Sequence, residues 1–331
     1  MIRRPGEVAT TVDAAVRRCL AGLALALGCH CIGAQAAAPV TCPPTARALS
    51  AAEVEAGRRE AIDRGFLWRI ARDGRVSYLY GTLHIAQLRW MFPGPRTLRA
   101  LNASDTLALE LDMLDPDIQR RMAIGMQADP AEALPAPLAE RLRAQVEAAC
   151  LPAEAMAPLA PAVQLAALTS LAGRWDGLDP AYAIDAFLAG YGRALAKTVV
   201  SLETPEFQLA LLKGEPSDAE AALARGLEQL EQAQVRPMLL RIAALWDQGR
   251  IDELTRYEQW CECADTAAER AALKRLLDDR NLPLAERIDA LHTAGQRVFA
   301  AVGALHMVGP TGLPTLLAQR GFTVQRVDPG R

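Results

Sequence analysis

The sequence lacks features that would place it in several common functional classes. It has no long run of Lys or Arg and a formal net charge of only -3 over 331 residues, so it offers no basic face to neutralise nucleic-acid phosphates. The Gly-rich turn at 309–312 has neither the GxGxxG spacing nor the lysine of phosphate-binding loops. No stretch beyond the first 36 residues is long and apolar enough to cross a bilayer. We therefore expect no nucleic-acid partner, and the composition, 51% hydrophobic and 23% charged, is that of an ordinary globular protein.

The first 36 residues have the pattern of a secretory signal peptide. Arginines within 3–18 precede the apolar run 20–27, and the small residues of 34–36 resemble a cleavage site. The alternative is a membrane anchor, but the apolar run is short for a span of about 20 residues. We expect a mature chain that begins near Ala37, has no transmembrane segment, and is periplasmic or secreted.

Cysteine is scarce in the expected mature chain, and its number there is even. The four that remain after the leader are Cys42, Cys150, Cys261 and Cys263. Four cysteines allow three pairings, among which the sequence does not choose. Cys261, Glu262 and Cys263 form a CxC motif that could bind a soft metal ion. The sequence has no second CxC and no histidine nearby to complete a tetrahedral site. In an oxidising compartment we therefore expect disulfides, one of which would tie the mature N-terminus to the helical region.

Histidine is also scarce, yet two of the four histidines occupy matching positions. The segments VSYLYGTLHIA (76–86) and VFAAVGALHMV (298–308) align without a gap, and each places a histidine, His84 or His306, three residues after a glycine that ends an apolar run. In α/β folds, ligands bind beyond the carboxyl ends of strands. We expect folding to bring both histidines into one site. The alternative is that both are core histidines satisfied by hydrogen bonds. For His292, on a predicted helix, we expect no chemical role.

Two carboxylates end predicted strands. Glu110 lies near the end of the strand predicted over 106–111, and Glu203 follows the strand predicted over 198–202. A carboxylate in this position has either reached solvent or is buried for a reason, because burial without a partner is costly. A bound cation or a general-base role would offset that cost. For Glu203, a solvated turn residue is an equal alternative.

The pattern along the chain predicts an α/β fold. The Asp73-Gly74 pair between two β-prone runs predicts a hairpin, and a β-loop-α-β unit ends the chain. We expect one domain over 37–331, with a central mixed sheet that carries both strand-GxLH motifs. A large helical insertion over about 113–295 separates the motifs, with helices at 266–277 and 284–292 on either side of Arg280.

Several segments between about 66 and 327 are distinctive: FLWRI, YLYGTLH, ALELD, AIDAF, SLETPEFQ, DDRN and VGALHMVGPTGLPTLLAQRGFTV. Together they resemble the TraB/PrgY/GumN family, which includes the Tiki proteases. The resemblance implies an α/β domain in which two GxxH motifs and a glutamate form a divalent transition-metal site, with metal-dependent peptidase activity in the Tiki branch. The implied residues here are Gly81 with His84, Gly303 with His306, and Glu110.

The first functional hypothesis is a periplasmic or secreted metal-dependent hydrolase that acts on a peptide or protein. In this hypothesis His84, His306 and Glu110 hold Mn²⁺, Co²⁺ or Zn²⁺, and Glu110 either ligates the metal or acts as a base. Glu203 and Asp185 are further candidates. Arg280 is a candidate for stabilising a developing oxyanion. The alternatives are a non-catalytic protein that binds or sequesters a peptide in the same cleft, and a metal-free, esterase-like hydrolase with a histidine as general base.

Overall fold

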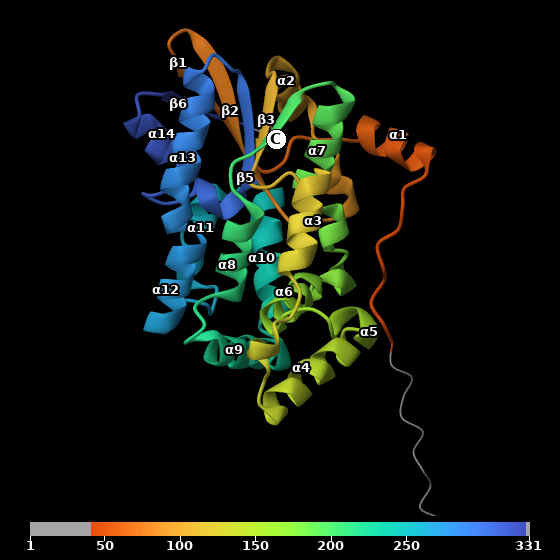
Figure 1. Ribbon diagram of the computed structural model, residues 1–331. Helices are drawn as coiled ribbons and strands as arrows, with labels where there is room; N and C mark the ends of the chain where they lie inside the picture. The colour runs from red at the N-terminus through yellow and green to blue at the C-terminus, as the bar shows by residue number, and fades with distance from the viewer. Residues whose placement is uncertain (1–40, 329–331) are drawn as a thin grey trace, which may run out of the picture. The chain divides into compact units, whose positions relative to one another are not determined.

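A mixed sheet of six strands organises the part of the chain that the structure describes, residues 41–328 of a computed structural model (Figure 1). The predicted signal peptide lies outside the described residues. The strand order is β4-β3-β5-β2-β1-β6. The strands are β1 (Phe66–Arg72), β2 (Arg75–Thr82), β3 (Thr106–Leu109), β4 (Thr198–Ser201), β5 (Val298–Gly303) and β6 (Thr323–Val327). The predicted α/β class and mixed sheet are confirmed.

The sheet has a parallel part and an antiparallel part. Strands β4, β3, β5 and β2 run parallel, whereas β1 is antiparallel to both β2 and β6. The β1-β2 hairpin turns at Asp73 and Gly74, whose φ angles are 51° and 72°. A two-residue turn with both φ angles positive fits the right-handed twist of the strands, so the predicted hairpin is confirmed.

Strand β5 forms the centre of the core. All six of its residues are buried, because β3 and β2 flank it and helices such as α13 (Asp278–Thr293) pack along it. A strand covered on both faces is expected to read as a continuous apolar run, and VFAAVG does. Phe299 and Leu107, which pair in neighbouring strands, are fully buried on one face of the sheet, and Leu79, which pairs with Ala300, is fully buried on the other.

The chain between β3 and β5 is helical apart from β4, as expected. The α-helices before α13 are α1 (Ala51–Arg59), α2 (Pro95–Ala103), α3 (Pro116–Gly125), α4 (Ala136–Ala148), α5 (Ala153–Met156), α6 (Pro161–Leu171), α7 (Ile184–Ala194), α8 (Pro205–Lys213), α9 (Ala219–Glu231), α10 (Val235–Asp247), α11 (Ile251–Leu254) and α12 (Ala267–Leu276), and α14 (Leu313–Gln319) follows β5. Helices α4, α6 and α9 enclose a second, smaller core around Leu142, Leu168 and Leu227. This part therefore packs around apolar residues of its own.

Helix α13 begins earlier than the sequence predicts. The predicted helix starts at 284, whereas α13 starts at Asp278 and contains Pro283. Pro283 is the sixth helical residue, so its missing N–H removes one hydrogen bond inside the helix. Because α13 starts at Asp278, Arg280 and Asn281 lie in its first turn and not in a connection between helices.

Two disulfides join the four cysteines. Cys42 pairs with Cys150, just beyond α4, and Cys261 pairs with Cys263. The first bridge ties the segment before α1 to the helical region, as predicted. Within 41–328, no helix has the length and apolar composition needed to cross a bilayer.

Candidate active site

The site forms where four adjacent parallel strands end. His84 follows β2, His306 follows β5, Glu110 directly follows β3, and Glu203 follows β4. Parallel strands place their carboxyl ends at one edge of a sheet, so these four residues meet there although they are far apart in the sequence. The site lies at the position where open α/β sheets bind ligands.

The two GxLH motifs lie side by side with a shift of one residue. The sequence repeat aligns Gly81 with Gly303, but the sheet pairs Gly81 with Val302 and Thr82 with Gly303. The two histidines therefore occupy different environments. The His84 side chain is 57% exposed, whereas His306 is only 3% exposed.

Three predicted site residues surround one point beside the backbone of Gly303. A Cβ atom added to Gly303 would lie 3.2 Å from Oε1 of Glu110, 3.4 Å from Nε2 of His84 and 3.5 Å from Cδ2 of His306. The φ angle of Gly303 is -48°, so its conformation does not require glycine. The limited space does require glycine, because any side chain at this position would enter the centre of the site.

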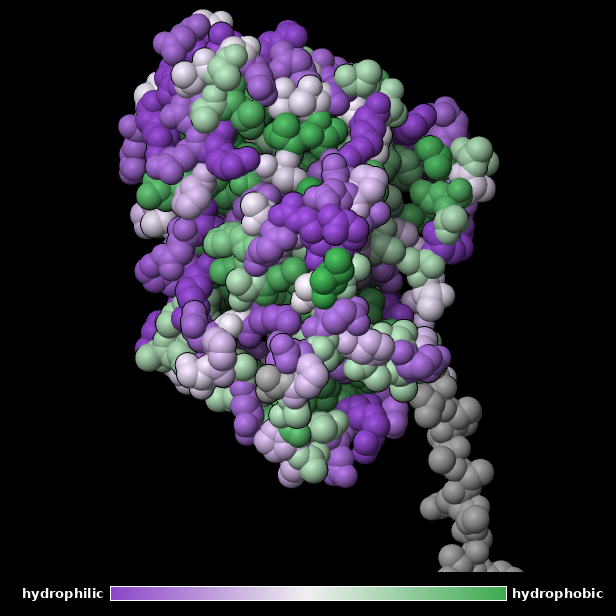
Figure 2. Space-filling model, in the orientation of Figure 1, coloured by the Kyte–Doolittle hydropathy of each residue, from purple (hydrophilic) through white to green (hydrophobic). Residues whose placement is uncertain are grey.

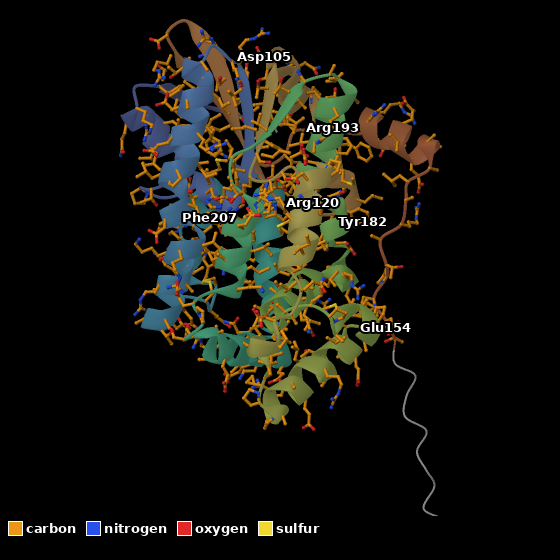
Figure 3. The ribbon with its side chains drawn as sticks, in the orientation of Figure 1. Asp105, Arg120, Glu154, Tyr182, Arg193 and Phe207 are labelled. Carbon is orange, nitrogen blue, oxygen red and sulfur yellow. A yellow bond between two sulfur atoms is a disulfide. The ribbon has the colours of Figure 1, made fainter. Side chains whose placement is uncertain are left out.

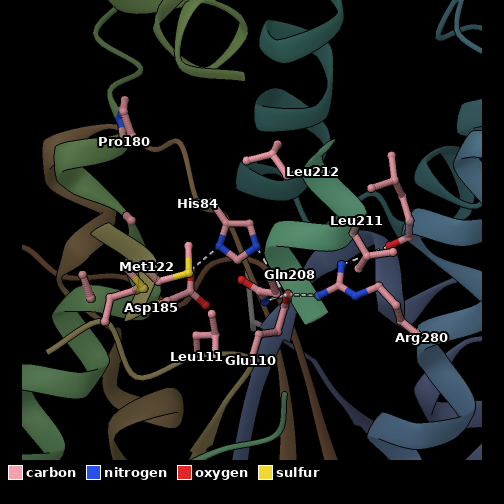
Figure 4. Close-up of a pocket in the computed structure, with 14 residues that line it drawn as sticks. His84, Glu110, Leu111, Met122, Pro180, Asp185, Gln208, Leu211, Leu212 and Arg280 are labelled. Carbon is pink, nitrogen blue, oxygen red and sulfur yellow. Dashed lines mark hydrogen bonds and ion pairs between the residues drawn. The ribbon is translucent and has the colours of Figure 1, made fainter. Parts of the chain in front are cut away.

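Each imidazole is oriented through its Nδ1 atom. Nδ1 of His84 lies 2.8 Å from Oδ2 of Asp185, in the first turn of α7 (Figure 4). Nδ1 of His306 lies 2.7 Å from Oδ1 of Asn281, in the first turn of α13. An N–H donated from Nδ1 turns Nε2 of each ring toward the site, where Nε2 of His84 lies 3.5 Å from Oε1 of Glu110. Metal-binding histidines are commonly held through Nδ1 in this way.

The Glu110 carboxylate is buried and fully engaged. The backbone N–H of Gly303 donates to its Oε1 at 2.7 Å, and Arg280 donates to its Oε2. The Arg280 guanidinium also donates to both carboxylate oxygens of Glu203, at 2.9 and 2.6 Å, and Gln208 donates to Glu203 at 2.9 Å. The alternative of Glu203 as a solvated turn residue is wrong, since its side chain is only 6% exposed.

Electrostatics set the charges of the three central groups. Attraction from Asp185 raises the pKa of His84 well above its usual value, against the effect of desolvation, and Glu110 adds to the rise. Water screens part of this attraction, because the ring is more than half exposed. Burial lowers the pKa of His306 to about 4. Burial would also raise the pKa of Glu110, but the charge of His84, with smaller contributions from His306 and Arg280, holds it well below its usual value.

A cleft of about 460 Å³ opens beside His84 and Glu110, whereas His306 does not line it. Its polar floor includes His84, Glu110, Asp185, Gln208 and Arg280, and its rim is apolar. The exposed rim residues are Met113 (39% exposed), Leu212 (38%) and Leu276 (41%). On the face drawn in Figure 2, apolar side chains are visible between hydrophilic ones.

A second hollow, of about 490 Å³, adjoins the cleft. The two share Leu211, Leu212 and Leu276 in their walls. Phe207, near the start of α8, also lines the second hollow and is 42% exposed (Figure 3). The apolar surface therefore continues beyond the polar floor of the cleft.

The sequence model of the TraB/PrgY/gumN family matches residues 66–326. The chain belongs to the TraB/PrgY/gumN family. The matched segment contains all the site residues described above, and the family resemblance of the sequence motifs is confirmed. No curated protein and no solved structure matches the chain.

Two polar residues of this TraB/PrgY/gumN site were not predicted as functional. Asn281 orients His306 and Gln208 contacts Glu203, and both lie in distinctive segments, DDRN and SLETPEFQ. Their presence in those segments was the available signal. Ala183 lines the cleft two residues before Asp185, and its φ of -51° is an ordinary value for a residue with a side chain.

A divalent metal ion fits part of this arrangement. Among the residues that the structure describes, no three His, Cys, Asp or Glu side chains are disposed as a metal-binding group. The two oriented imidazoles and the space beside Gly303 suit an ion, but Glu110 would have to exchange one of its present hydrogen bonds to join them. Both histidines are therefore candidate ligands, with Glu110 as the third.

Proposed function

We propose that this protein is a metal-dependent hydrolase that cleaves peptides or proteins with apolar side chains near the scissile bond. One observation carries the proposal: His84, His306 and Glu110, from three adjacent strands, surround the space beside Gly303. Each imidazole presents Nε2 while its Nδ1 is held by another side chain.

The charge of the site supports a divalent cation. The site contains three carboxylates, those of Glu110, Glu203 and Asp185, and one guanidinium, that of Arg280, which pairs with the two glutamates. With both imidazoles neutral, the site has an excess of two negative charges. The negative charges of Asp185 and Glu110 raise the pKa of His84, which supports a positive charge at this position. Mn²⁺, Co²⁺ or Zn²⁺ would balance the excess, with His84 and His306 as nitrogen ligands.

Such an ion supplies Lewis acidity and a nucleophile at neutral pH. The protein's residues position it and the substrate. Asp185 and Asn281 fix the two imidazoles, and Arg280 holds Glu110 beside them. Glu110 is a ligand or the base that receives a proton from water, while Glu203 keeps the Arg280 guanidinium in place.

The cleft supports an extended, apolar substrate. Its apolar rim continues into the second hollow along α8 and α12, so side chains on one side of the scissile bond would remain in contact with protein. Exposed apolar surface of this kind commonly marks a binding site.

We also propose that the protein works outside the cytosol, in the periplasm or after secretion. The disulfide between Cys42 and Cys150 supports this location, because such bonds persist in oxidising compartments.

A metal-free hydrolase is the second candidate, and the Asp185-His84 hydrogen bond favours it. A carboxylate that orients a histidine is the arrangement of a general base. The residues that line the cleft include no Ser, Thr or Cys, so this candidate would use water as the nucleophile.

The test combines metal analysis with a peptidase assay. The exported protein is analysed for bound metal, treated with a chelator, and assayed on an apolar peptide library before and after addition of Mn²⁺, Co²⁺ or Zn²⁺. About one metal per chain and cleavage restored by metal would support the proposal. Cleavage without metal would identify the metal-free hydrolase, and peptide binding without cleavage would identify a sequestering protein. Glu110→Gln should abolish cleavage, whereas the control Glu206→Gln, at an exposed ion pair, should not.

A further inference from the structure

A separate cavity of about 210 Å³ lies among the helices, and it shares no lining residue with the active-site cleft. Its walls come from α4, α6, α9, α10 and the segment after α6. The lining is apolar except for Gln145, Arg174 and Arg236, and it includes the half-exposed Trp175. Nothing in the proposed hydrolysis uses this cavity.

Arg174 is the unusual member of this lining. It is only 7% exposed, and one of its terminal nitrogens donates to the carbonyl oxygen of Ala149 at 2.6 Å. Its buried Nε has no hydrogen-bond partner, and within 41–328 no carboxylate pairs with the guanidinium. A buried charge without a counter-charge is unfavourable, so an anion at the guanidinium would offset this cost.

The other buried or cavity-lining arginines have the carboxylate partner that Arg174 lacks. Arg280, also buried, pairs with two glutamates. Arg236, which also lines the cavity, pairs with Asp176 through two hydrogen bonds of 2.7 and 3.0 Å. Arg174 has no such pair, so the cavity has one uncompensated positive charge.

We propose that this cavity binds a small carboxylate with an apolar body, with Arg174 as its anchor. The guanidinium offers the planar donors that match a carboxylate, and the remaining walls suit a hydrocarbon or aromatic group. One uncompensated charge suits a monoanion. A volume of about 210 Å³ is below the ~300–1,000 Å³ of drug-sized sites, so the ligand is a small acid or the C-terminal residue of a peptide.

The cavity is held in shape by a covalent link. Ala149, which accepts from Arg174, precedes Cys150, and Pro43, which lines the cavity, follows Cys42. The disulfide between these two cysteines fixes both walls. A preformed site loses less free energy on ordering when a ligand binds.

The first experiment compares two ligands of the same shape on the wild-type protein. Phenylacetate carries the charge and phenylacetamide does not. Calorimetry should show that phenylacetate binds at least about tenfold more tightly, since hydrogen bonds to charged groups are the stronger ones. The indole N–H signal of Trp175, assigned with Trp175→Phe, should shift on binding. Equal affinities, tighter binding of inorganic phosphate, or an unchanged Trp175 signal would overturn the proposal.

A second arm separates the two sources of the carboxylate. A dipeptide ending in free phenylalanine is compared with its C-terminal amide and with phenylacetate. Tighter binding of the free dipeptide than of phenylacetate assigns the site to peptide ends, and the reverse assigns it to small acids. Binding of the amide as tightly as the acid would contradict the role of Arg174.

The variant experiment removes the positive charge of Arg174. Arg174→Met should reduce phenylacetate affinity at least about tenfold, while the ligand-free melting temperature stays the same or rises, because an uncompensated charge has been removed. The control, Arg141→Met, removes an arginine of α4 that pairs with Glu231, and it should leave binding intact. Binding by Arg174→Met within threefold of wild type would overturn the proposal. If this variant did not fold, the comparison of acid and amide on wild-type protein would decide.

Discussion

The backbone N–H of Gly303 donates a 2.7 Å hydrogen bond to Oε1 of Glu110. This bond joins the end of β5 to the residue that follows β3, so the central strand itself positions the buried carboxylate. The same glycine leaves open the space that Glu110, His84 and His306 surround. Gly303 therefore supplies a hydrogen-bond donor and also leaves open space in the site.

Gly303→Ala tests the importance of that gap. The added methyl would lie 3.2 Å from Oε1 of Glu110, so we expect peptidase activity and metal affinity to fall at least about tenfold, with a stability loss of about 1–3 kcal/mol from overpacking. Activity assays, calorimetry and urea unfolding measure the three effects. The control is Gly190→Ala, whose new Cβ would meet only Leu114, at 3.8 Å. Full activity in Gly303→Ala would mean that the space has no function.

The two GxLH histidines should act on one metal ion. We expect His84→Ala and His306→Ala each to lower metal affinity more than the ~10–100-fold typical of losing a residue that only supports a ligand. The double variant should lose little more than either single variant, because two ligands of one ion act as a unit. Calorimetry on the four proteins of the cycle measures this. Strict additivity, or full metal binding in either single variant, would mean that the histidines serve separate sites.

Arg280→Lys should disturb the carboxylates without removing the positive charge. A lysine ammonium cannot bridge Glu110 and Glu203 as the planar guanidinium does. We expect the free energy of unfolding to fall by about 2 kcal/mol and the turnover rate to fall with it. Arg121→Lys is the matched control, because its pair with Glu206 is exposed, and it should leave both quantities unchanged. Equal behaviour of the two variants would show that the buried bridge does not position Glu110.

His292 should make the fold less stable in mild acid. Its Nδ1 lies 2.8 Å from the Ser77 hydroxyl in the core, and burial lowers its pKa from the usual value. The unfolded chain then takes up a proton near pH 6.5 while the folded chain resists it. The stabilisation is therefore complete above about pH 6.5 and is lost as the pH falls below that value.

Urea unfolding between pH 7.5 and 5, with chelator present, measures this effect. His292→Asn keeps a hydrogen-bonding atom near Ser77 and does not titrate, so its stability should fall less steeply with acid than that of wild type. Identical slopes for the two proteins would contradict the assignment.

Sequence reasoning reached the main features of the site because they depend on strand ends. His84 and His306 repeat one pattern, and the ends of parallel strands must share an edge. It did not predict a role for Asn281, because the helix was expected to start at 284 and so to leave Asn281 in a connection. The shift of one residue between the GxLH motifs also depends on packing, and no sequence alignment contains it.

Arg174 was beyond sequence reasoning for a different reason. Arginine is common on surfaces, and nothing in its neighbours indicates burial without a carboxylate. Only the packing of α4, α6 and α10 around it reveals the unpaired charge. Partners that come from separate helices leave no local pattern in the chain.

The position of β5 determines when the site can form during synthesis of the chain. This strand lies between β2 and β3, yet it follows β1 to β4 in the chain and begins only at Val298. A chain that ends at Thr293 has a sheet without its middle strand, and it has neither Gly303 nor His306. The residues of the site therefore cannot come together until β5 and the segment after it have been synthesised, so a chain that stops before β5 has only part of the site.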